Sequence, residues 1–258
     1  MITMSISNQK GGTGKTTCTV NLAAALERKE RRTLLIDLDP QASLSEYYFP
    51  PAELADSHQT IYDALVEKQS IQPHSIGENR DLIPATIDLA AADLKLSDTL
   101  SRERILTKFL KPLASVYDYC LIDCSPSLGV LTINALTAAE HVCIPVETEL
   151  LAERTVKLIL NTIEEVKESD LNPHLQVWRI IPTMFDGRLA HHREILEALK
   201  MKYGGLLYPE PVKATTKYKD AAIDRLDVGE LDQLQKEYWD QLATIFIKET
   251  YSKEKAHE

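Results

Sequence analysis

The segment KGGTGKTT, residues 10–17, constrains the fold of this chain more than any other part of its sequence. It follows a short apolar segment, residues 2–6, and precedes a helical pattern that starts at Lys15. Its glycines can adopt the positive φ angles that a tight turn requires, so successive backbone N–H groups can converge on one anion at the start of the helix. The segment therefore predicts a strand, a phosphate-binding loop and a helix, in that order.

Two side chains in this segment suit a nucleoside triphosphate that carries a magnesium ion. Lys15 places a positive charge near the β- and γ-phosphates of ATP, and the hydroxyl of Thr16 can ligate Mg²⁺. The segment departs from the common G-x-x-x-x-G-K-[ST] pattern, because its run begins with a lysine, Lys10, instead of a glycine. A glycine-rich turn with a capping threonine is the alternative, and the flanking strand and helix patterns argue against it. The expected nucleotide-binding residues are Gly11, Gly12, Thr13, Gly14, Lys15, Thr16 and Thr17.

Apolar segments alternate with helical patterns along the rest of the chain. Runs rich in Ile, Val, Leu and Cys, without strict alternation, are typical of strands buried on both faces, and here they span residues 2–7, 33–38, 119–123, 141–146 and 175–181. Helical patterns span residues 15–29, 61–67, 102–114, 130–139, 153–167, 190–203 and 231–249. We therefore expect an α/β fold with a doubly wound, mostly parallel central sheet flanked by helices, in one domain over residues 1–258. In such sheets the ligand binds at the carboxyl ends of the strands.

Three carboxylates end strands of this predicted sheet, on the same side as the phosphate-binding loop. Asp37 and Asp39 lie two residues apart after one strand, so their side chains point in a similar direction toward the loop, and Asp123 ends another strand. Magnesium bound to ATP keeps several waters and takes few protein ligands, so the hydroxyl of Thr16 with Asp123 behind it is the expected arrangement. Asp37 could instead cap the turn before Pro40.

Composition and charge limit the classes of function. At 258 residues, with 44% hydrophobic and 26% charged residues, the chain can bury a substantial core. It has no apolar run long enough to span a membrane and no signal-peptide pattern at its start, so we expect a cytoplasmic protein. Its four cysteines are then expected to be reduced and mostly buried. The formal net charge of −10 means that any binding of nucleic acid needs a local basic patch.

The segment KGGTGKTT resembles the deviant Walker A motif of the ParA/MinD superfamily, and three further segments match that superfamily in order. They are DLDPQ at residues 37–41, DYCLIDCSPSLG at residues 118–129 and TMFDGR at residues 183–188. Together these matches span most of the chain and are most similar to the ParA and Soj partition ATPases. The resemblance implies an ATPase of weak intrinsic activity that uses ATP and Mg²⁺ and forms a homodimer around ATP.

The resemblance also implies roles for single residues. Lys10 would reach the phosphates of the nucleotide held by the other subunit, as an arginine finger does elsewhere, and Asp39 would position the attacking water. Lys10, Lys15 and Asp39 are thus the expected catalytic residues, and the expected magnesium site consists of Thr16, Asp37 and Asp123. Pro209 falls in the segment where the family's adenine-contacting loop lies, although a proline-rich turn explains that segment equally well. A further segment, PVETEL at residues 145–150, departs from the family's pattern, so its coupling to the nucleotide is expected to differ.

DNA is the expected partner of a basic segment near the carboxyl end. Residues 200–219 hold five lysines and a single glutamate, and two arginines lie just upstream. In Soj-like proteins, basic residues of this part bind DNA without sequence preference once the dimer forms, which implies association with the nucleoid. A solvated helix face with ordinary surface lysines is the alternative. The expected DNA-binding residues are Arg188, Lys202, Lys213, Lys217 and Lys219.

Two functions from different classes follow from the resemblance. The first is an ATPase that binds DNA and partitions or positions cargo while a ParB-like adaptor stimulates hydrolysis. Its cargo could be a plasmid, a chromosome or a protein assembly such as a carboxysome. The second is a MinD-like nucleotide switch that does not bind DNA. The last predicted helix carries four acidic residues against two lysines, whereas a membrane-seeking helix needs a basic polar face, so no membrane partner is expected.

Overall fold

The computed structural model describes residues 1–57 and 59–254, which contain a seven-stranded sheet in the order β3-β4-β2-β5-β1-β6-β7. Neighbouring strands are parallel except at one edge, where β3 runs antiparallel to β4. The expected α/β fold with a mostly parallel central sheet is confirmed. The strands are β1 (Ile2–Ile6), β2 (Thr33–Leu38), β3 (His74–Ser75), β4 (Arg80–Ile83), β5 (Tyr119–Cys124), β6 (His141–Glu147) and β7 (Gln176–Thr183).

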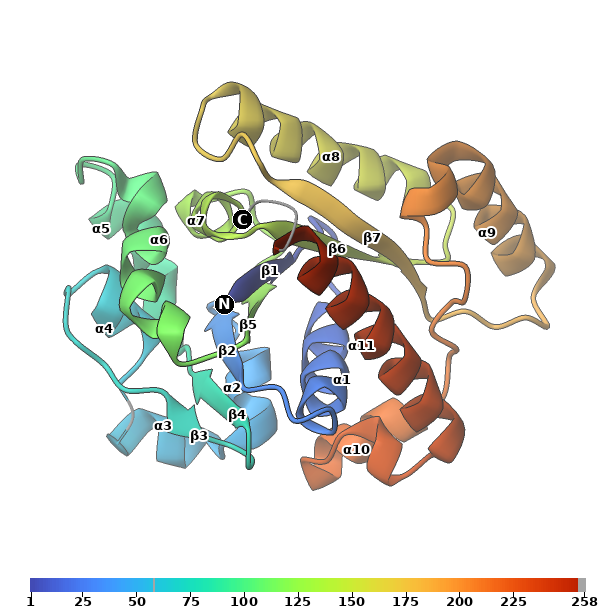
Figure 1. Cartoon of the computed structure of the whole chain (residues 1–258), viewed down its shortest axis with the longest axis horizontal. Helices are drawn as coiled ribbons and strands as arrows, with labels where there is room; N and C mark the ends of the chain where they lie inside the picture. Colours follow the sequence, from blue (N-terminus) through green and yellow to red (C-terminus); the bar gives the residue numbers. More distant parts are fainter. Residues whose placement is uncertain (58, 255–258) are drawn as a thin grey trace.

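Helices cover both faces of this sheet (Figure 1). One face packs against α1 and α11, while α4, α6 and α7 cover the other face over β2 and β5, and α8 covers it over β6 and β7. Within the described ranges, every helix is too short or too polar to cross a membrane. The helices are α1 (Lys15–Glu27), α2 (Ser43–Tyr48), α3 (Pro51–Ser57), α4 (Ile61–Leu65), α5 (Ala92–Lys95), α6 (Ile105–Leu110), α7 (Val130–Ala138), α8 (Ala152–Glu168), α9 (Ala190–Tyr203), α10 (Lys217–Asp224) and α11 (Gln233–Glu254).

The central strands are apolar along their length because both of their faces are buried. In β2, Leu34 and Ile36 belong to the core under α4 and α6, whereas Leu35 belongs to the core under α1 and α11. A strand in this position has no polar face, which explains the lack of alternation in its sequence. The four cysteines are free thiols and all are buried, as expected.

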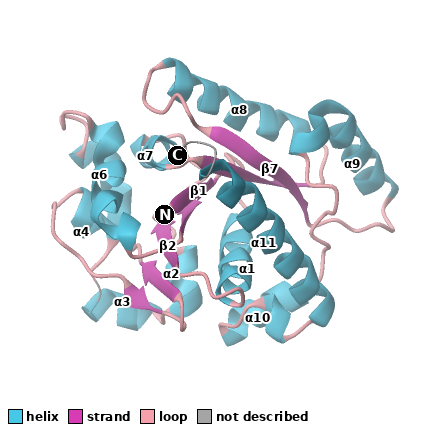
Figure 2. Cartoon of the chain, in the orientation of Figure 1, coloured by secondary structure: helices cyan, strands magenta, loops and turns pink. Residues whose placement is uncertain are grey.

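The structure differs from the sequence expectations in its shorter elements. The patterns do not predict α2, α3, α10, β3 or β4, and β4 escapes notice because only Leu82 and Ile83 of its four residues are buried. The helix expected over residues 102–114 is broken into α6 and two flanking 3₁₀ turns. Pro112 lies in the second of these turns and cannot donate the hydrogen bond that would continue an α-helix. The resulting α6 is much shorter than α8 and α11 (Figure 2).

The register of the central strands brings the expected site residues together. Asp37 in β2 lies opposite Asp123 in β5, and Asp123 in turn lies opposite Ile6 at the end of β1. Since these strands are parallel, their carboxyl ends meet at one edge of the sheet. The glycine-rich segment leaves the sheet at that edge, directly after β1.

Candidate active site

The loop between β1 and α1 has the backbone geometry of an anion-binding turn. Gly12 and Gly14 have φ angles of 75° and 87°, a region that residues with a side chain rarely adopt. The ammonium group of Lys15 lies within the loop and donates a hydrogen bond to the carbonyl oxygen of Lys10 at 3.3 Å. From the end of β7, the hydroxyl of Thr183 donates to the carbonyl oxygen of Thr13 at 2.9 Å. The loop therefore has a defined shape, with the amino end of α1 at its base.

A buried asparagine outside the expected motif also shapes this loop. The side-chain amide of Asn8 donates to the carbonyl oxygen of Pro145 at 2.7 Å, and its own oxygen accepts from the backbone N–H of Lys10 at 3.0 Å. Asn8 thus fixes the start of the loop to β6. In the sequence, the only indication of this role is that Asn8 follows the predicted strand and precedes the loop. A single asparagine in that position belongs to no specific motif, so the sequence analysis did not select it.

Thr16 and Asp123 meet at the amino end of α1. The hydroxyl of Thr16 donates to Oδ2 of Asp123 at 2.6 Å, whereas Oδ1 of Asp123 is buried and accepts no hydrogen bond from the described residues. Burial, and then the neighbouring carboxylate of Asp37, raise the pKa of Asp123 above its ordinary value. A buried carboxylate with one unpartnered oxygen fits the surroundings of Mg²⁺, because a cation would favour its ionised form.

Asp37 lies beside Asp123, but its own oxygens already accept hydrogen bonds. Oδ2 accepts from the backbone N–H and the hydroxyl of Ser45 at 2.8 and 2.7 Å, and Oδ1 accepts from the backbone N–H of Asp39 at 3.1 Å. Burial raises the pKa of Asp37 as well. We expected this side chain to point toward the phosphate-binding loop, whereas two of its three contacts are with α2. Its part in the magnesium site stays a prediction that these contacts do not favour.

Asp39 follows β2 and is partly exposed, with its carboxylate accepting from the backbone N–H of Gln41 at 3.0 Å. Its charge contributes to the raised pKa of both Asp37 and Asp123, so the three carboxylates lie within electrostatic reach of one another. In residues 1–57 and 59–254, no three Asp, Glu, His or Cys side chains are arranged to hold a metal ion by themselves. The contact between Thr16 and Asp123 is therefore the feature of the site that best fits Mg²⁺, which commonly completes its shell with water and phosphate oxygens.

Lys10 is held by two carboxylates of its own chain. Its ammonium group contacts Glu147 at 2.6 Å and Glu149 at 2.9 Å, and its side chain is 32% exposed. The hydrogen bond to Glu147, followed by that to Glu149, raises the pKa of Lys10, and the same contact lowers the pKa of Glu149. Both glutamates belong to PVETEL, and the sequence did not predict their contact with Lys10. Lys10 must release them before it can contact a nucleotide in another subunit.

A cavity of about 630 Å³ opens beside the loop. Its lining includes Thr17 and Cys18 at the start of α1, Met184 after β7, and residues 212–216. The cavity also adjoins Gly14 of the loop. Pro209, the residue that the sequence predicts for base contact, is not in the lining of this cavity.

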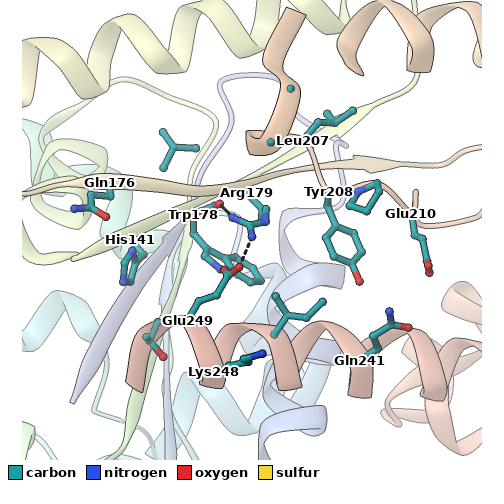
Figure 3. A pocket seen from close by; sticks show the side chains of 16 residues that line it. His141, Gln176, Trp178, Arg179, Leu207, Tyr208, Glu210, Gln241, Lys248 and Glu249 are labelled. Atoms are coloured by element: carbon teal, nitrogen blue, oxygen red, sulfur yellow. Dashed lines mark hydrogen bonds and ion pairs between the residues drawn. The ribbon is translucent and has the colours of Figure 1, made fainter. Parts of the chain in front are cut away.

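Pro209 lies in the wall of a different cavity. That cavity has a volume of about 980 Å³ and lies between β7 and α11, where Arg179 pairs with Glu249 (Figure 3). The cause is the path of the chain beside β7: the backbone N–H of Tyr208 bonds to Ile180, and the chain reaches the end of β7 only around residues 212–213. A contact between Pro209 and a base stays a prediction that this placement does not favour.

The basic residues expected to bind DNA fall into two groups. Arg188, Lys202 and Lys217 form ion pairs with Asp186, Glu153 and Asp220 of the same chain. Lys213 and Lys219 form no ion pair with any described residue, and both lie on the rim of the cavity beside the loop. Figure 1 draws α9, which carries Lys202, well apart from α10. The structure therefore does not gather the five side chains into one patch within a single chain.

Known proteins are similar to this chain over most of its length. The sequence profile of a family described as an AAA domain matches residues 1–177. The chain is 40% identical over 221 residues to the sporulation initiation inhibitor protein Soj of Bacillus subtilis, with 84% of this chain and 86% of that protein covered. It is 43% identical over 199 residues to the chromosome partitioning protein ParA of Myxococcus xanthus, with 76% and 69% covered.

A solved structure with bound ligands is also similar to this chain. It is the cobyrinic acid a,c-diamide synthase of Mycobacterium smegmatis with a bound ATP analogue and magnesium. The two chains are 34% identical, the TM-score is 0.78, and 94% of each chain is covered. The similarity thus extends over nearly the whole fold, including the elements that carry the loop and the carboxylates.

Proposed function

Because the chain belongs to the ParA/Soj family of partition ATPases, we propose that it binds ATP with Mg²⁺ and hydrolyses the ATP to ADP and phosphate. The observation that carries this proposal is the contact between Thr16 and Asp123 at the end of the glycine-rich loop, with one oxygen of Asp123 buried and without a hydrogen-bond partner among the described residues. The ligands in the M. smegmatis structure, an ATP analogue and magnesium, support the same pair of ligands here.

Each group in the site then has a defined part in hydrolysis. The backbone N–H groups of the loop and the ammonium group of Lys15 bind the β- and γ-phosphates. Magnesium, when bound, neutralises charge on the phosphate oxygens. Asp39 orients the water that attacks the γ-phosphorus, the bond from that phosphorus to the bridging oxygen breaks, and ADP leaves. Asp39 suits this part because it is the partly exposed carboxylate of the three.

Two copies of the chain close around ATP in this proposal, and Lys10 of each copy contacts the phosphates bound by the other. The positive charge of Lys10 would there neutralise charge that develops during transfer of the γ-phosphoryl group. Its present partners, Glu147 and Glu149, form partly exposed ion pairs, and such pairs contribute only about 0.2–1 kcal/mol each. A triphosphate in the partner can therefore compete for Lys10.

The ATP-bound dimer then binds DNA without sequence preference and positions cargo, and a ParB-like adaptor stimulates hydrolysis and release. Lys213 and Lys219 support the DNA step, because they are exposed cations on the rim of the cavity beside the loop. A dimer presents these cations twice, so it engages more phosphates than one chain does. A protein assembly as cargo, and a nucleotide switch that does not bind DNA, are the alternatives.

Replacing Asp39 with alanine tests the catalytic assignment. We expect Asp39→Ala to bind ATP and accumulate as a dimer, while Mg²⁺-dependent release of phosphate falls at least about 100-fold because the attacking water is no longer oriented. Turnover is measured by phosphate release and dimer formation by sedimentation. Asp98→Ala, at an exposed aspartate away from the site, is the matched control. Wild-type turnover in Asp39→Ala would contradict the assignment.

A gel shift on non-specific duplex DNA at low salt separates the DNA-binding function from the switch. We expect a shift with ATP and a much weaker one with ADP or without nucleotide. The shift should weaken steeply as salt is added, because binding releases counterions from the phosphates. If ATP produces no shift at low salt, DNA binding is not part of the mechanism, and the result favours the nucleotide switch that does not bind DNA.

A further inference from the structure

Ser45 connects three parts of the chain that meet behind the active site. It lies in α2, and its side chain is completely buried. Its hydroxyl donates to Oδ2 of Asp37 at 2.7 Å, and its backbone N–H donates to the same oxygen at 2.8 Å. The hydroxyl oxygen also accepts from the backbone N–H of Ala85, just after β4, at 2.8 Å.

The direction of these hydrogen bonds is fixed by chemistry. A backbone N–H can only donate, so the hydroxyl of Ser45 accepts from Ala85 and is left to give its own proton to Asp37. Replacing this buried serine with an apolar side chain would leave the backbone N–H of Ala85 unpaired and would remove one of the two hydrogen bonds to Oδ2 of Asp37. The contact is therefore specific for a hydroxyl.

Asp37 passes this constraint on to the residue after β2. Its second oxygen, Oδ1, accepts from the backbone N–H of Asp39 at 3.1 Å. The hydrogen bonds therefore run in series from Ala85 to Ser45, from Ser45 to Asp37, and from Asp39 back to Asp37. Each step lies at the carboxyl edge of the sheet, where β2 and β4 are paired.

We propose that Ser45 is a positioning residue for hydrolysis, which fixes the carboxylate of Asp37 and through it the backbone of Asp39. This inference rests on the proposed function, in which Asp39 orients the attacking water. The sequence predicts Asp37 as part of the magnesium site, whereas this inference makes it a link between Ser45 and Asp39. The hydrogen bonds of Asp37 connect these two residues and do not reach the phosphate-binding loop. The segment after β4, an element that the sequence patterns missed, thereby reaches the active site through one hydrogen bond.

A pair of variants with equal side-chain shape tests the inference. Ser45→Thr keeps the hydroxyl, and Ser45→Val replaces it with a methyl group, so both add the same bulk to a buried position. We expect Ser45→Val to lower kcat about 10- to 100-fold below that of Ser45→Thr, since a small misplacement of a reacting group costs up to about 100-fold. KM for ATP and the affinity for ATP should agree within about twofold between the two variants, because the phosphate-binding loop is unchanged.

Controls separate positioning from folding and from the proposed function itself. Ser43→Ala, at an exposed serine in the same helix, should keep wild-type kcat, and unfolding of both Ser45 variants is followed with bound ATP. Equal kcat in Ser45→Thr and Ser45→Val would overturn the inference. So would a fall in kcat that is matched by an equal loss of ATP affinity. If Asp39→Ala turns ATP over at the wild-type rate, the proposed function fails instead, whatever the Ser45 variants do.

Discussion

The carboxylates at the ends of β2 and β5 and the cations between residues 188 and 219 lie in opposite physical settings. Asp37 and Asp123 are buried, and hydrogen bonds from Ser45 and Thr16 hold their carboxylate oxygens in place. Arg188 and Lys202 are exposed and contact acidic side chains that are also accessible to solvent. In the first region the fold determines where each charge lies, whereas in the second the side chains can exchange partners at little cost.

This difference sets what a substitution does in each region. A buried carboxylate has a high desolvation cost and fixed hydrogen-bond partners, so removing its charge changes both stability and the site. In the proposed function, an exposed cation is one of several that contact the same long polyanion, so removing it should change DNA binding by a small factor. The comparison therefore predicts large effects at the strand ends and small effects in the basic segment.

The largest expected effect is that of Asp123→Asn, which removes the charge and keeps the shape. Mg²⁺-dependent hydrolysis of ATP should fall at least about 100-fold, because an amide cannot replace the carboxylate that lies behind Thr16. Turnover is measured as phosphate release over a range of Mg²⁺ concentrations. Asp118→Asn, at the exposed opposite end of the same strand, should keep full turnover, and equal losses in the two variants would break the comparison.

The second prediction concerns the stability of the nucleotide-free protein as a function of pH. The pKa of Asp123 is raised in the folded protein, so the folded state keeps a proton that the unfolded chain has released. The free energy of unfolding should therefore fall as the pH rises above the ordinary aspartate pKa of 3.8. The loss is about 1.4 kcal/mol for each unit by which the pKa is raised.

Urea unfolding without nucleotide, over about pH 5 to 8, measures the slope of the free energy of unfolding against pH. Asp123→Asn should flatten it, because the amide does not titrate, and Asp118→Asn should leave it unchanged. The raised pKa of Asp37 contributes a slope of the same sign, so some dependence should persist in Asp123→Asn. A slope of the wild-type size in that variant would show that the buried carboxylate does not carry the effect.

The third prediction sharpens the comparison within the basic segment. Lys213 and Lys219 have no ion-pair partner among the described residues, so the double variant Lys213→Ala/Lys219→Ala should weaken ATP-dependent DNA binding about 3- to 10-fold and lower the salt dependence. Lys202→Ala should change binding less than about twofold, because Glu153 already neutralises that lysine. Filter binding at several salt concentrations measures both. A larger loss in Lys202→Ala than in the double variant would contradict the division into two groups.

The same difference explains how much of the site the sequence could predict. The contact between Thr16 and Asp123 was expected because a local motif fixes the loop and parallel strands bring their carboxyl ends together. Both are properties of short segments and of a regular sheet. The shape of the loop, with positive φ angles at Gly12 and Gly14, follows from the same motif.

Contacts that follow neither from a local motif nor from the pairing of the strands could not be found in this way. Ser45 in α2 contacts Ala85 after β4, and Lys10 pairs with Glu147 at the end of β6 and with Glu149 beyond it. No local pattern marks these pairs, since each needs the relative placement of two elements. The position of Pro209 could not be predicted for a related reason: its segment runs beside β7, and only the pairing of the two shows which residue reaches the strand end.

The last prediction concerns Lys10, whose contacts combine the two settings. Replacing its partners with neutral analogues, in Glu147→Gln/Glu149→Gln, removes two partly exposed ion pairs and leaves the lysine in place. Pairs of this kind contribute about 0.2–1 kcal/mol each, so the two together oppose dimerisation by about 0.4–2 kcal/mol per subunit, and ATP-dependent dimerisation should strengthen at least about twofold. Sedimentation at several protein concentrations, with ATP and in the Asp39→Ala background to prevent turnover, measures this change.

The control is Lys10→Ala, alone and combined with the two glutamine substitutions. If the glutamates act by holding Lys10, they have no effect once it is absent, so the two alanine variants should dimerise equally. A gain that persists without Lys10 would mean that the substitutions act by reducing repulsion between two acidic surfaces. Higher salt provides a second test, because it screens exposed ion pairs and should reduce the difference between wild type and the glutamine variant. A difference that does not change with salt would place these glutamates with the buried carboxylates rather than with the exposed charges.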